Sequence, residues 1–549
     1  MDKRLLLSLA AVIVVACSAP ADKEVPRIVN FVNFIRELEP RNEAITPEVL
    51  FETVRSEADA LREYGFRGTW LLQYDALIDP RYQELMKEEI ARGSEVGGWW
   101  EITQPHVEDA GYEWRGRFPW DWHADKGFSV GYTPEERERL VDVYMDKFRE
   151  IFGEYPHSVG SWFMDAHTLA YMREKYGVEA SCNCKDQEGT DGYTLWGGYW
   201  HGAYYPSKVN AYMPSQTEEG QIDIPVFRML GSDPLYQYSA GVGGAVQGVC
   251  TMEPTYYNAQ KPEWVGWYLR CHTEDPALGY TYFQAGQENS FTWEVFKKGY
   301  EVQLPQIAEL QKAGKLRVET LVESARAFRK KYPVNPPTAC SALEDYTDNK
   351  GRTIWFDSRF YRANIFWEGD RMGIRDIHLF DEKLESYYFR NVCTSNRCVY
   401  KTLPLVDGCL WSVASDMASL RFYAKDASGD PSGWRELKGG EPVIARKGDS
   451  MVVRWPLKDG GAEIRIVLAE GSISATCTDK SLEWCMQLNT QPEAALPFQS
   501  IEGRTIKAVQ DGYEYSVTLG KGTVEDLRGQ GDGLVYRIVP ERNRVMLDM

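Results

Sequence analysis

The sequence is short of basic charge. Its 549 residues include 62 basic and 81 acidic side chains, which gives a formal net charge of −19. Because a nucleic-acid partner requires clustered Lys and Arg, none is expected. The sequence also lacks a glycine-rich phosphate loop, a dinucleotide fingerprint and a nucleophile elbow, and its seven histidines show no metal-ligand spacing. We therefore expect neither a cofactor nor a metal.

Long apolar runs are absent after the N-terminus. The run at residues 5–16 follows Lys3 and Arg4, as in an export signal, and is shorter than the roughly 20 residues of a spanning helix. Its end, Val14-Val15-Ala16-Cys17, resembles the lipobox of bacterial lipoproteins. That resemblance implies a signal peptide of residues 1–16, a lipid on Cys17, a tether over residues 17–26, and an exported protein anchored to a bacterial membrane, periplasmic or at the cell surface. An ordinary secretory signal is the alternative.

Residues 27–332 alternate seven or eight times between short apolar runs and helical periodicity. Thr46-Pro47 and Thr133-Pro134 each place a capping hydroxyl before a proline at the first helical position, which predicts two helix starts. This alternation is typical of an α/β protein built as a (β/α) barrel of seven or eight units.

A proline-rich linker, residues 333–340, separates this region from residues 341–549. In the second region, short alternating runs rich in β-branched residues predict a C-terminal antiparallel β-sandwich domain. Ten cysteines follow Cys17, and their even number permits disulfides, with Cys393–Cys398 and Cys477–Cys485 as candidates for short closed loops.

Acidic residues follow several of the predicted strands. Catalytic groups of parallel barrels lie at the C-terminal strand ends, so we expect these carboxylates to converge: Asp75, Glu101, Asp165 and Glu288. Cleavage of a glycosidic bond needs two carboxyl groups, one protonated and one ionised. For any one of these acids, a structural role as a solvated loop charge or a helix cap is about as expected as a catalytic role.

Aromatic residues make up 13% of the chain, with 18 Trp and 32 Tyr. Because flat aromatic faces bury the apolar C–H faces of sugars, we predict a sugar site of aromatic and polar residues. Its predicted members are Asn33, Trp99, Trp100, His106, Trp196, Tyr199, His201, Tyr204, Tyr205 and Asn210. The alternative for the loop at residues 193–212 is a packed loop whose aromatics cover the barrel. The Trp-rich loop at residues 101–130 is long for an idle connection.

Three segments resemble the barrel shared by polysaccharide deacetylases and a set of glycosidases. Gly93-Ser94-Glu95-Val96-Gly97 is similar to the Gly-His-Glu-Ile-Gly of the deacetylases' second motif. Residues 152–156 and 175–178 look like the framework around their third motif. The resemblance implies the barrel fold for the first part of the chain and, with the lipobox, a two-domain bacterial lipoprotein of that superfamily.

The metal-binding pattern of the deacetylases is not kept. Those enzymes hold a metal with an aspartate and two histidines four residues apart, and the matching positions here are Asp75, Trp99 and Thr103. Asp75 with the nearby His106 makes a poor metal site.

The sequence therefore favours an exported glycoside hydrolase that uses paired carboxylates on an oligo- or polysaccharide. Two alternatives stay open: a non-catalytic glycan-binding lipoprotein on a degenerate barrel, and a metal-dependent polysaccharide deacetylase or esterase.

Overall fold

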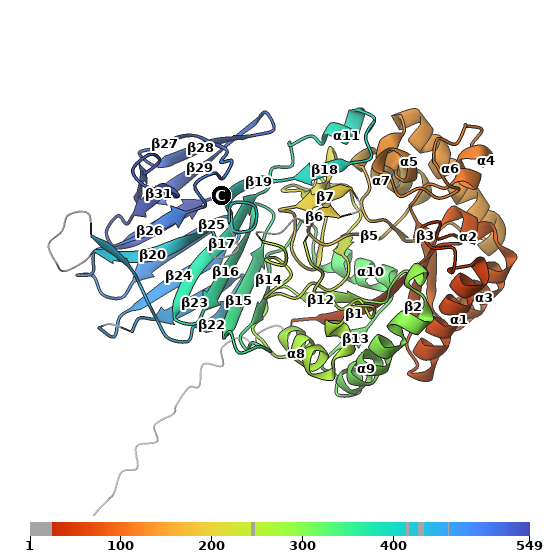
Figure 1. Cartoon of the computed structure of the whole chain (residues 1–549), viewed down its shortest axis with the longest axis horizontal. Coiled ribbons are helices and arrows are strands. Elements are labelled where there is room, and N and C mark those ends of the chain that lie inside the picture. Colours follow the sequence, from red (N-terminus) through yellow and green to blue (C-terminus); the bar gives the residue numbers. More distant parts are fainter. Residues whose placement is uncertain (1–24, 191, 243–246, 413–416, 426–432, 459) are drawn as a thin grey trace, which may run out of the picture.

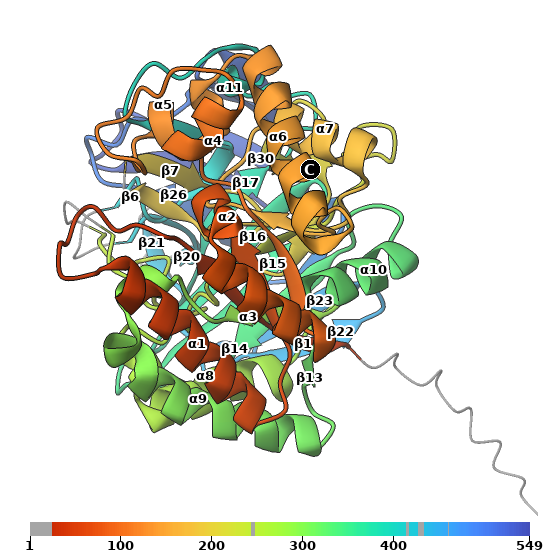
Figure 2. The same ribbon diagram turned by 90° about the vertical axis from the view of Figure 1, so that its right-hand side faces the viewer.

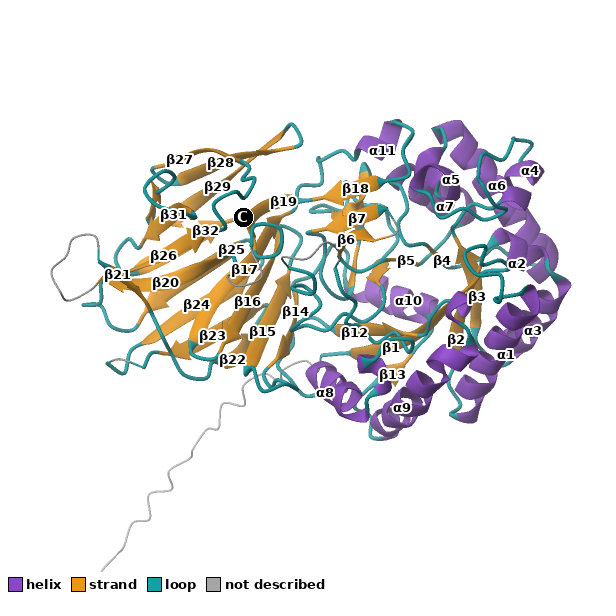
Figure 3. Cartoon of the chain, in the orientation of Figure 1, coloured by secondary structure: helices purple, strands orange, loops and turns teal. Residues whose placement is uncertain are grey.

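The computed structural model describes residues 25–190, 192–242, 247–412, 417–425, 433–458 and 460–549. Parallel strands and helices form the N-terminal part of the molecule, and antiparallel sheets form the C-terminal part (Figure 1). Almost all helices therefore lie at one end of the molecule (Figure 3). The predicted signal peptide and lipid site at Cys17 lie outside the described residues. Within the described ranges, no helix combines the length and apolar character needed to cross a bilayer.

A parallel sheet forms the centre of the N-terminal part. Its strand order is β12-β1-β2-β3-β4, and every pairing is parallel. The strand β13 pairs in parallel with the beginning of β1, at Ile28 and Val29. The strands are β1 (Arg27–Ile35), β2 (Gly68–Leu72), β3 (Glu95–Trp99), β4 (Val159–Gly160), β12 (Thr281–Ala285) and β13 (Arg317–Val318). Their side chains are almost all buried, which is why the sequence shows continuous apolar runs here.

The sheet curves onward but backbone pairing does not close it into a ring. A parallel bridge between Ser158 and Ala180 leads to β5 (Ser181–Asn183), which pairs in parallel with β11 (Val226–Arg228). The other edge of β11 pairs with the antiparallel β8 (Ala203–Tyr204). Among the described residues no backbone pairing joins β11 to β12, so the expected closed barrel is corrected to an open one. A side chain links the two ends of the open sheet instead. The hydroxyl of Tyr280, which precedes β12, donates to the carbonyl of Ala203 in β8 at 2.8 Å.

Helices cover the outside of this sheet (Figure 2). Thr46 and Thr133 cap α1 and α6 as the sequence predicts, and both helices have proline in the first turn. The helix α6 ends at Gly153 with φ of 87°, a left-handed conformation that glycine adopts without strain. The helices are α1 (Pro47–Glu63), α2 (Tyr74–Ile78), α3 (Pro80–Ala91), α4 (Gln104–Asp109), α5 (Ala124–Gly127), α6 (Pro134–Phe152), α7 (Ala166–Tyr176), α8 (Pro262–Thr273), α9 (Trp293–Lys312) and α10 (Leu321–Lys331).

Two antiparallel sheets form the C-terminal part and share one hydrophobic core. The first contains β14 (Thr338–Ala342), β15 (Gly351–Asp357), β16 (Tyr361–Glu368), β17 (Arg371–Leu379), β19 (Leu403–Asp407), β20 (Ser419–Lys425), β21 (Trp434–Glu436), β26 (Trp484–Asn489), β30 (Thr523–Asp526) and β31 (Leu534–Val539). The second contains β22 (Val443–Lys447), β23 (Ser450–Pro456), β24 (Glu463–Ala469), β25 (Ser472–Cys477), β27 (Phe498–Glu502), β28 (Thr505–Gln510), β29 (Tyr513–Lys521) and β32 (Arg544–Asp548). The predicted antiparallel β-rich region is confirmed.

Strand pairing and buried ion pairs join the N-terminal and C-terminal parts. From the C-terminal part, β18 (Cys398–Lys401) pairs in parallel with β7 (Tyr193–Trp196), beside β6 (Gln187–Thr190). The short strands β9 (Pro206–Ser207) and β10 (Asn210–Pro214) and the helix α11 (Tyr387–Arg390) complete this region. Arg362 forms ion pairs with Asp186 of the N-terminal part and with Asp376. All three side chains are buried, so these charges are partnered across the junction.

Two smaller expectations are also corrected. The strand β14 begins at Thr338, so only residues 333–337 of the predicted linker at residues 333–340 lie outside regular structure. Cys393, Cys398, Cys477 and Cys485 are all present as thiols, so neither Cys393–Cys398 nor Cys477–Cys485 forms a disulfide. Nine of the ten cysteines after Cys17 are buried, where a thiol packs as a small apolar side chain.

Candidate active site

A cavity of about 440 Å³ opens at the C-terminal ends of the parallel strands. Arg36 follows β1 directly, Glu101 follows β3, and Glu288 follows β12. Parallel strands bring these ends to one edge of the sheet, so Arg36 and Ser290, which are 254 positions apart in the chain, line the same cavity.

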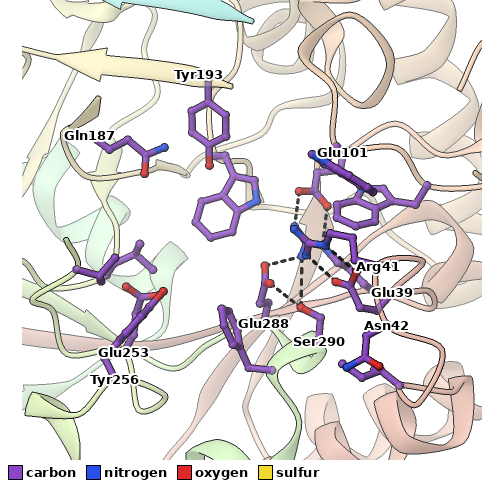
Figure 4. A pocket seen from close by; sticks show the side chains of 18 of the residues that line it. Glu39, Arg41, Asn42, Glu101, Gln187, Tyr193, Glu253, Tyr256, Glu288 and Ser290 are labelled. Atoms are coloured by element: carbon purple, nitrogen blue, oxygen red, sulfur yellow. Dashed lines mark hydrogen bonds and ion pairs between the residues drawn. The ribbon is translucent and has the colours of Figure 1, made fainter. Parts of the chain in front are cut away.

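Arg36 joins two of the predicted carboxylates. Its Nε and Nη2 donate to Glu101 at 3.0 and 2.7 Å, and its Nη1 lies 2.7 Å from a Glu288 oxygen (Figure 4). The Gln73 amide also donates to Glu101. The contacts use different nitrogens of one guanidinium group, so the nearest oxygens of Glu101 and Glu288 lie no more than about 8 Å apart. This limit is below the largest separation of paired glycosidase carboxyl groups, about 9.5 Å.

The charge of Arg36 is held in place by its surroundings. Burial alone lowers the pKa of a guanidinium, but the Glu101 and Glu288 carboxylates outweigh it and hold the pKa of Arg36 above its ordinary value. The guanidinium carbon also lies 4.2 Å from the ring centroid of Trp120. Arg36 is therefore charged and fixed.

Glu288 has a split environment. Burial raises its pKa, while Arg36 and the Ser290 hydroxyl, which donates to Glu288 at 2.5 Å, lower it. The net direction is upward, so Glu288 takes up a proton more readily than an exposed glutamate.

Glu253 lies across the cavity from Glu101 (Figure 4). Burial raises its pKa, although the Thr251 hydroxyl and the Gln287 amide each donate to it at 2.7 Å. The sequence did not single it out, because it follows β11 only after a long connection. A buried carboxyl group that holds its proton can act as a general acid.

Aromatic side chains wall the cavity. Trp120 and Trp122 come from the Trp-rich loop at residues 101–130, which the sequence marked as longer than an idle connection. The other aromatic members of the lining are Phe128, Trp162, Tyr193, Tyr256 and Phe291. Such a wall suits the apolar face of a sugar ring.

Asp75 lies behind this cavity and does not line it. It sits in the first turn of α2, and burial raises its pKa to about 7, with a smaller upward contribution from Glu101. One of its oxygens accepts from the Ala76 amide and the other has no partner among the described residues.

Asp165 is a correction to the predicted convergence. It does not line the cavity but caps α7, accepting from the Thr168 amide at 2.9 Å. The Ser129 hydroxyl and the Arg137 guanidinium, at 2.6 and 3.1 Å, occupy it further. The oxygens of Asp165 are therefore occupied by structural hydrogen bonds, as the helix-cap alternative predicts.

The predicted sugar-binding residues near the strand ends are also absent from the lining. Asn33 accepts from the Tyr300 hydroxyl at 3.0 Å inside the barrel. Trp99 stacks on Phe34 at 4.3 Å, and Trp100 packs edge-on against His106. The last of these, His106, bonds the Leu140 carbonyl at 2.8 Å, and burial lowers its pKa to about 4.

The predicted residues of the loop at 193–212 pack against other parts of the chain instead of facing this cavity. Trp196 donates to Asp407 at 2.8 Å, and Tyr199 donates to the Pro336 carbonyl at 2.9 Å. Further hydrogen bonds fix the rest, from Tyr282 to His201, Tyr204 to Ala211, Tyr205 to Tyr332 and Asn210 to Leu384. The packed-loop alternative describes these residues. Trp196, Tyr199 and Asn210 bond to residues 336–407, and the other three bond to residues of the N-terminal part.

The donor set does not fit the metal that deacetylases of this resemblance hold. In the described part of the chain, no three His, Cys, Asp or Glu side chains are grouped closely enough to bind a metal ion. Trp99, at one of the matching positions, is stacked in the core, and His106 already uses one nitrogen on Leu140.

No family profile matches the chain, and no curated protein matches its sequence. A solved structure of a candidate glycoside hydrolase/deacetylase from Parabacteroides distasonis is similar, with 16% identity and a TM-score of 0.51, over 69% of this chain and 91% of that one. A candidate polysaccharide deacetylase from Mycobacterium smegmatis aligns with 14% identity and a TM-score of 0.34, over 57% of this chain and 93% of that one. The resemblance indicated by the sequence is thus confirmed as a likeness of fold: the chain shares the architecture of a glycoside hydrolase/deacetylase barrel protein.

Proposed function

We propose that this chain is a carbohydrate-active hydrolase that cleaves glycosidic bonds in the cavity at the strand ends. The observation that supports this most is the placement of Glu101 and Glu253 on opposite sides of an aromatic-walled cavity (Figure 4). Glycosidic cleavage requires one protonated and one ionised carboxyl group flanking the bond.

The two carboxyl groups have different environments that suit these roles. Glu253 has a raised pKa caused by burial and donates the proton to the leaving oxygen. Glu101 accepts hydrogen bonds from Arg36 and Gln73, which hold its carboxylate in place, and it attacks the sugar carbon or activates water. The ion pair with Glu288 at 2.7 Å keeps the Arg36 guanidinium in position beside Glu101.

Hydrolysis of a panel of oligo- and polysaccharides tests the proposal, with release of reducing ends as the readout. Glu101→Gln and Glu253→Gln should each lower the rate by about 10²- to 10⁴-fold. Glu108→Gln, an exposed glutamate of α4, is the matched control and should leave the rate unchanged. Release that is unaffected by both active-site variants would exclude this assignment. Because Glu253 must carry its proton, the wild-type rate should fall as the pH rises through its pKa.

A second candidate is removal of acyl groups from a polysaccharide. The names of the similar structures favour it, since both include deacetylase. The donor set described above does not supply the three ligands of that chemistry. Measuring released acetate beside reducing ends on acetylated glycans, with and without added divalent metal, separates the two candidates. A non-catalytic glycan-binding protein would release neither product.

We further propose that the protein is exported and anchored by a lipid at Cys17. The apolar run at residues 5–16 and the motif that ends in Cys17 support this. Cys17→Ser should move the protein from the membrane fraction to the soluble fraction and abolish incorporation of labelled palmitate. Unchanged membrane attachment would contradict the proposal.

A further inference from the structure

One end of the cavity carries a buried cation that has no ion-pair partner among the described residues. Three basic residues line the cavity: Arg36, Arg41 and Lys185. Arg36 is paired with two carboxylates, and Arg41 donates to both oxygens of Glu39 at 2.7 and 2.6 Å. Lys185 forms no ion pair within 4 Å in the described part of the chain, although it is only 4% exposed.

The ammonium of Lys185 is also poorly bonded. The hydrogen bond it makes is a long one, 3.4 Å to the carbonyl of Asp186. Two residues further on, Gln187 is 3% exposed and lines the same cavity, and its amide nitrogen has no acceptor among the described residues. Figure 4 shows this amide directed toward the cavity.

The local chain holds both donors in place. Lys185 lies just after β5, Gln187 begins β6, and the chain bends at Asp186 between them. Asp186 does not line the cavity, and its buried carboxylate is held by Arg228 at 2.8 Å and by Arg362. This buried anchor fixes the segment that supplies both donors to the cavity lining.

Burying an unmatched ammonium and an unbonded amide costs free energy, commonly a few kcal/mol for each group. A bound anion would offset both costs at once. Burial raises the pKa of Glu253 more strongly than the charge of Lys185 lowers it, and the two side chains form no ion pair within 4 Å.

We infer that Lys185 and Gln187 bind an oxyanion carried by the substrate, a carboxylate or a sulfate ester on a sugar unit seated in the cavity. The inference rests on the proposed function and narrows it to acidic glycans. It runs against the overall charge of −19, which by itself favours neutral substrates. The local field at Lys185 decides recognition here, because charges farther than a Debye length of about 8 Å are screened.

Binding of matched neutral, uronic-acid and sulfated oligosaccharides, measured by calorimetry, tests the inference. A charge-assisted hydrogen bond contributes about 1.5–3 kcal/mol, so an acidic sugar should bind about 10- to 100-fold more tightly than its neutral counterpart. Preference for uronic acid or for sulfate identifies which oxyanion is recognised. Equal affinity for the neutral and both acidic sugars would overturn the inference.

Variants of Lys185 provide the internal control. Lys185→Met should abolish the preference for acidic sugars without lowering the thermal midpoint, because it removes an unmatched buried charge. Lys185→Arg should keep the preference, and Gln187→Leu should reduce it. Two results would refute the role of Lys185 in binding an oxyanion. One is a preference for acidic sugars that survives Lys185→Met, and the other is a large fall in the thermal midpoint of that variant.

The outcome is separable from that of the proposed function, since binding is measured without turnover. Acidic glycans that bind but are not cleaved would contradict only the hydrolase proposal. Glycans that are cleaved with no preference for acidic sugars would contradict only the oxyanion site.

Discussion

Replacing Arg36 by methionine tests the centre of the candidate site. Arg36 is the cation between Glu101 and Glu288, and the side chains of the three residues are 3%, 0% and 5% exposed. Water therefore cannot screen the carboxylates once the cation is removed. Breaking a buried ion pair by removing one partner typically costs about 3–5 kcal/mol, so Arg36→Met should destabilise the protein by at least that amount at neutral pH.

The loss should depend on pH in a defined direction. Burial already raises the pKa of Glu288, and without Arg36 the carboxyl groups would take up protons still more readily in the folded state. A group whose folded pKa lies above its unfolded value of about 4.3 stabilises the fold less as the pH rises through that interval. The difference between wild type and Arg36→Met should therefore be small near pH 4 and largest near pH 7.

Urea unfolding followed by tryptophan fluorescence at both pH values measures this difference. Arg81→Met is the matched control, because Arg81 is 37% exposed and pairs with Asp79 at the surface, where such pairs contribute about 0–1 kcal/mol. Adding Glu101→Gln and Glu288→Gln to Arg36→Met should restore most of the lost stability. Equal stability of Arg36→Met and Arg81→Met at pH 7 would refute the reasoning.

Three further predictions concern other parts of the structure. Asp165→Asn should lower the free energy of unfolding by about 2–4 kcal/mol and leave glycan affinity unchanged, since Asp165 caps α7 and lies outside the cavity; unfolding and calorimetry check this. Burial raises the pKa of Asp186, but the charges of Arg362 and Arg228 outweigh burial and hold that pKa below its ordinary value. The free energy of unfolding should therefore fall as the pH drops below about 4. Asp186→Asn should make this pH dependence weaker in acid unfolding curves. Trp120→Ala removes the ring that lines the cavity under Arg36 and should weaken glycan binding by about 5- to 30-fold in titrations; unchanged affinity would argue against stacking there.

The strand-end rule accounts for what was found from the sequence. It placed Glu101 and Glu288 correctly at one cavity, and applied to the first strand it would also have found Arg36. It failed for Asp165, because a residue after a strand is also the residue before a helix, where a carboxylate serves as a cap. Glu253 was missed because a long connection separates it from β11.

Aromatic composition was a weaker guide. The loops at residues 193–212 and 101–130 are both rich in Trp and Tyr. The first gives the cavity wall only Tyr193, whereas the second gives it Trp120, Trp122 and Phe128. The first is covered by sheets that begin about 130 residues later, where Trp200 stacks on Trp355 at 3.7 Å. The segment that packs on an aromatic side chain can be far away in the sequence, so the local sequence pattern does not predict whether that side chain faces a cavity or the protein interior.

Local chemistry was fixed by the chain itself: helix starts at Thr46 and Thr133, buried parallel strands, and a later region of alternating antiparallel ones. These follow from capping bonds and side-chain periodicity, which act over a few residues. Tertiary structure alone decided that the barrel stays open and that Glu253 faces Glu101. It also decided that Lys185 is buried with no ion pair within 4 Å among the described residues. Each depends on contacts between segments far apart in sequence, whose energies are set by burial and proximity that no local pattern encodes.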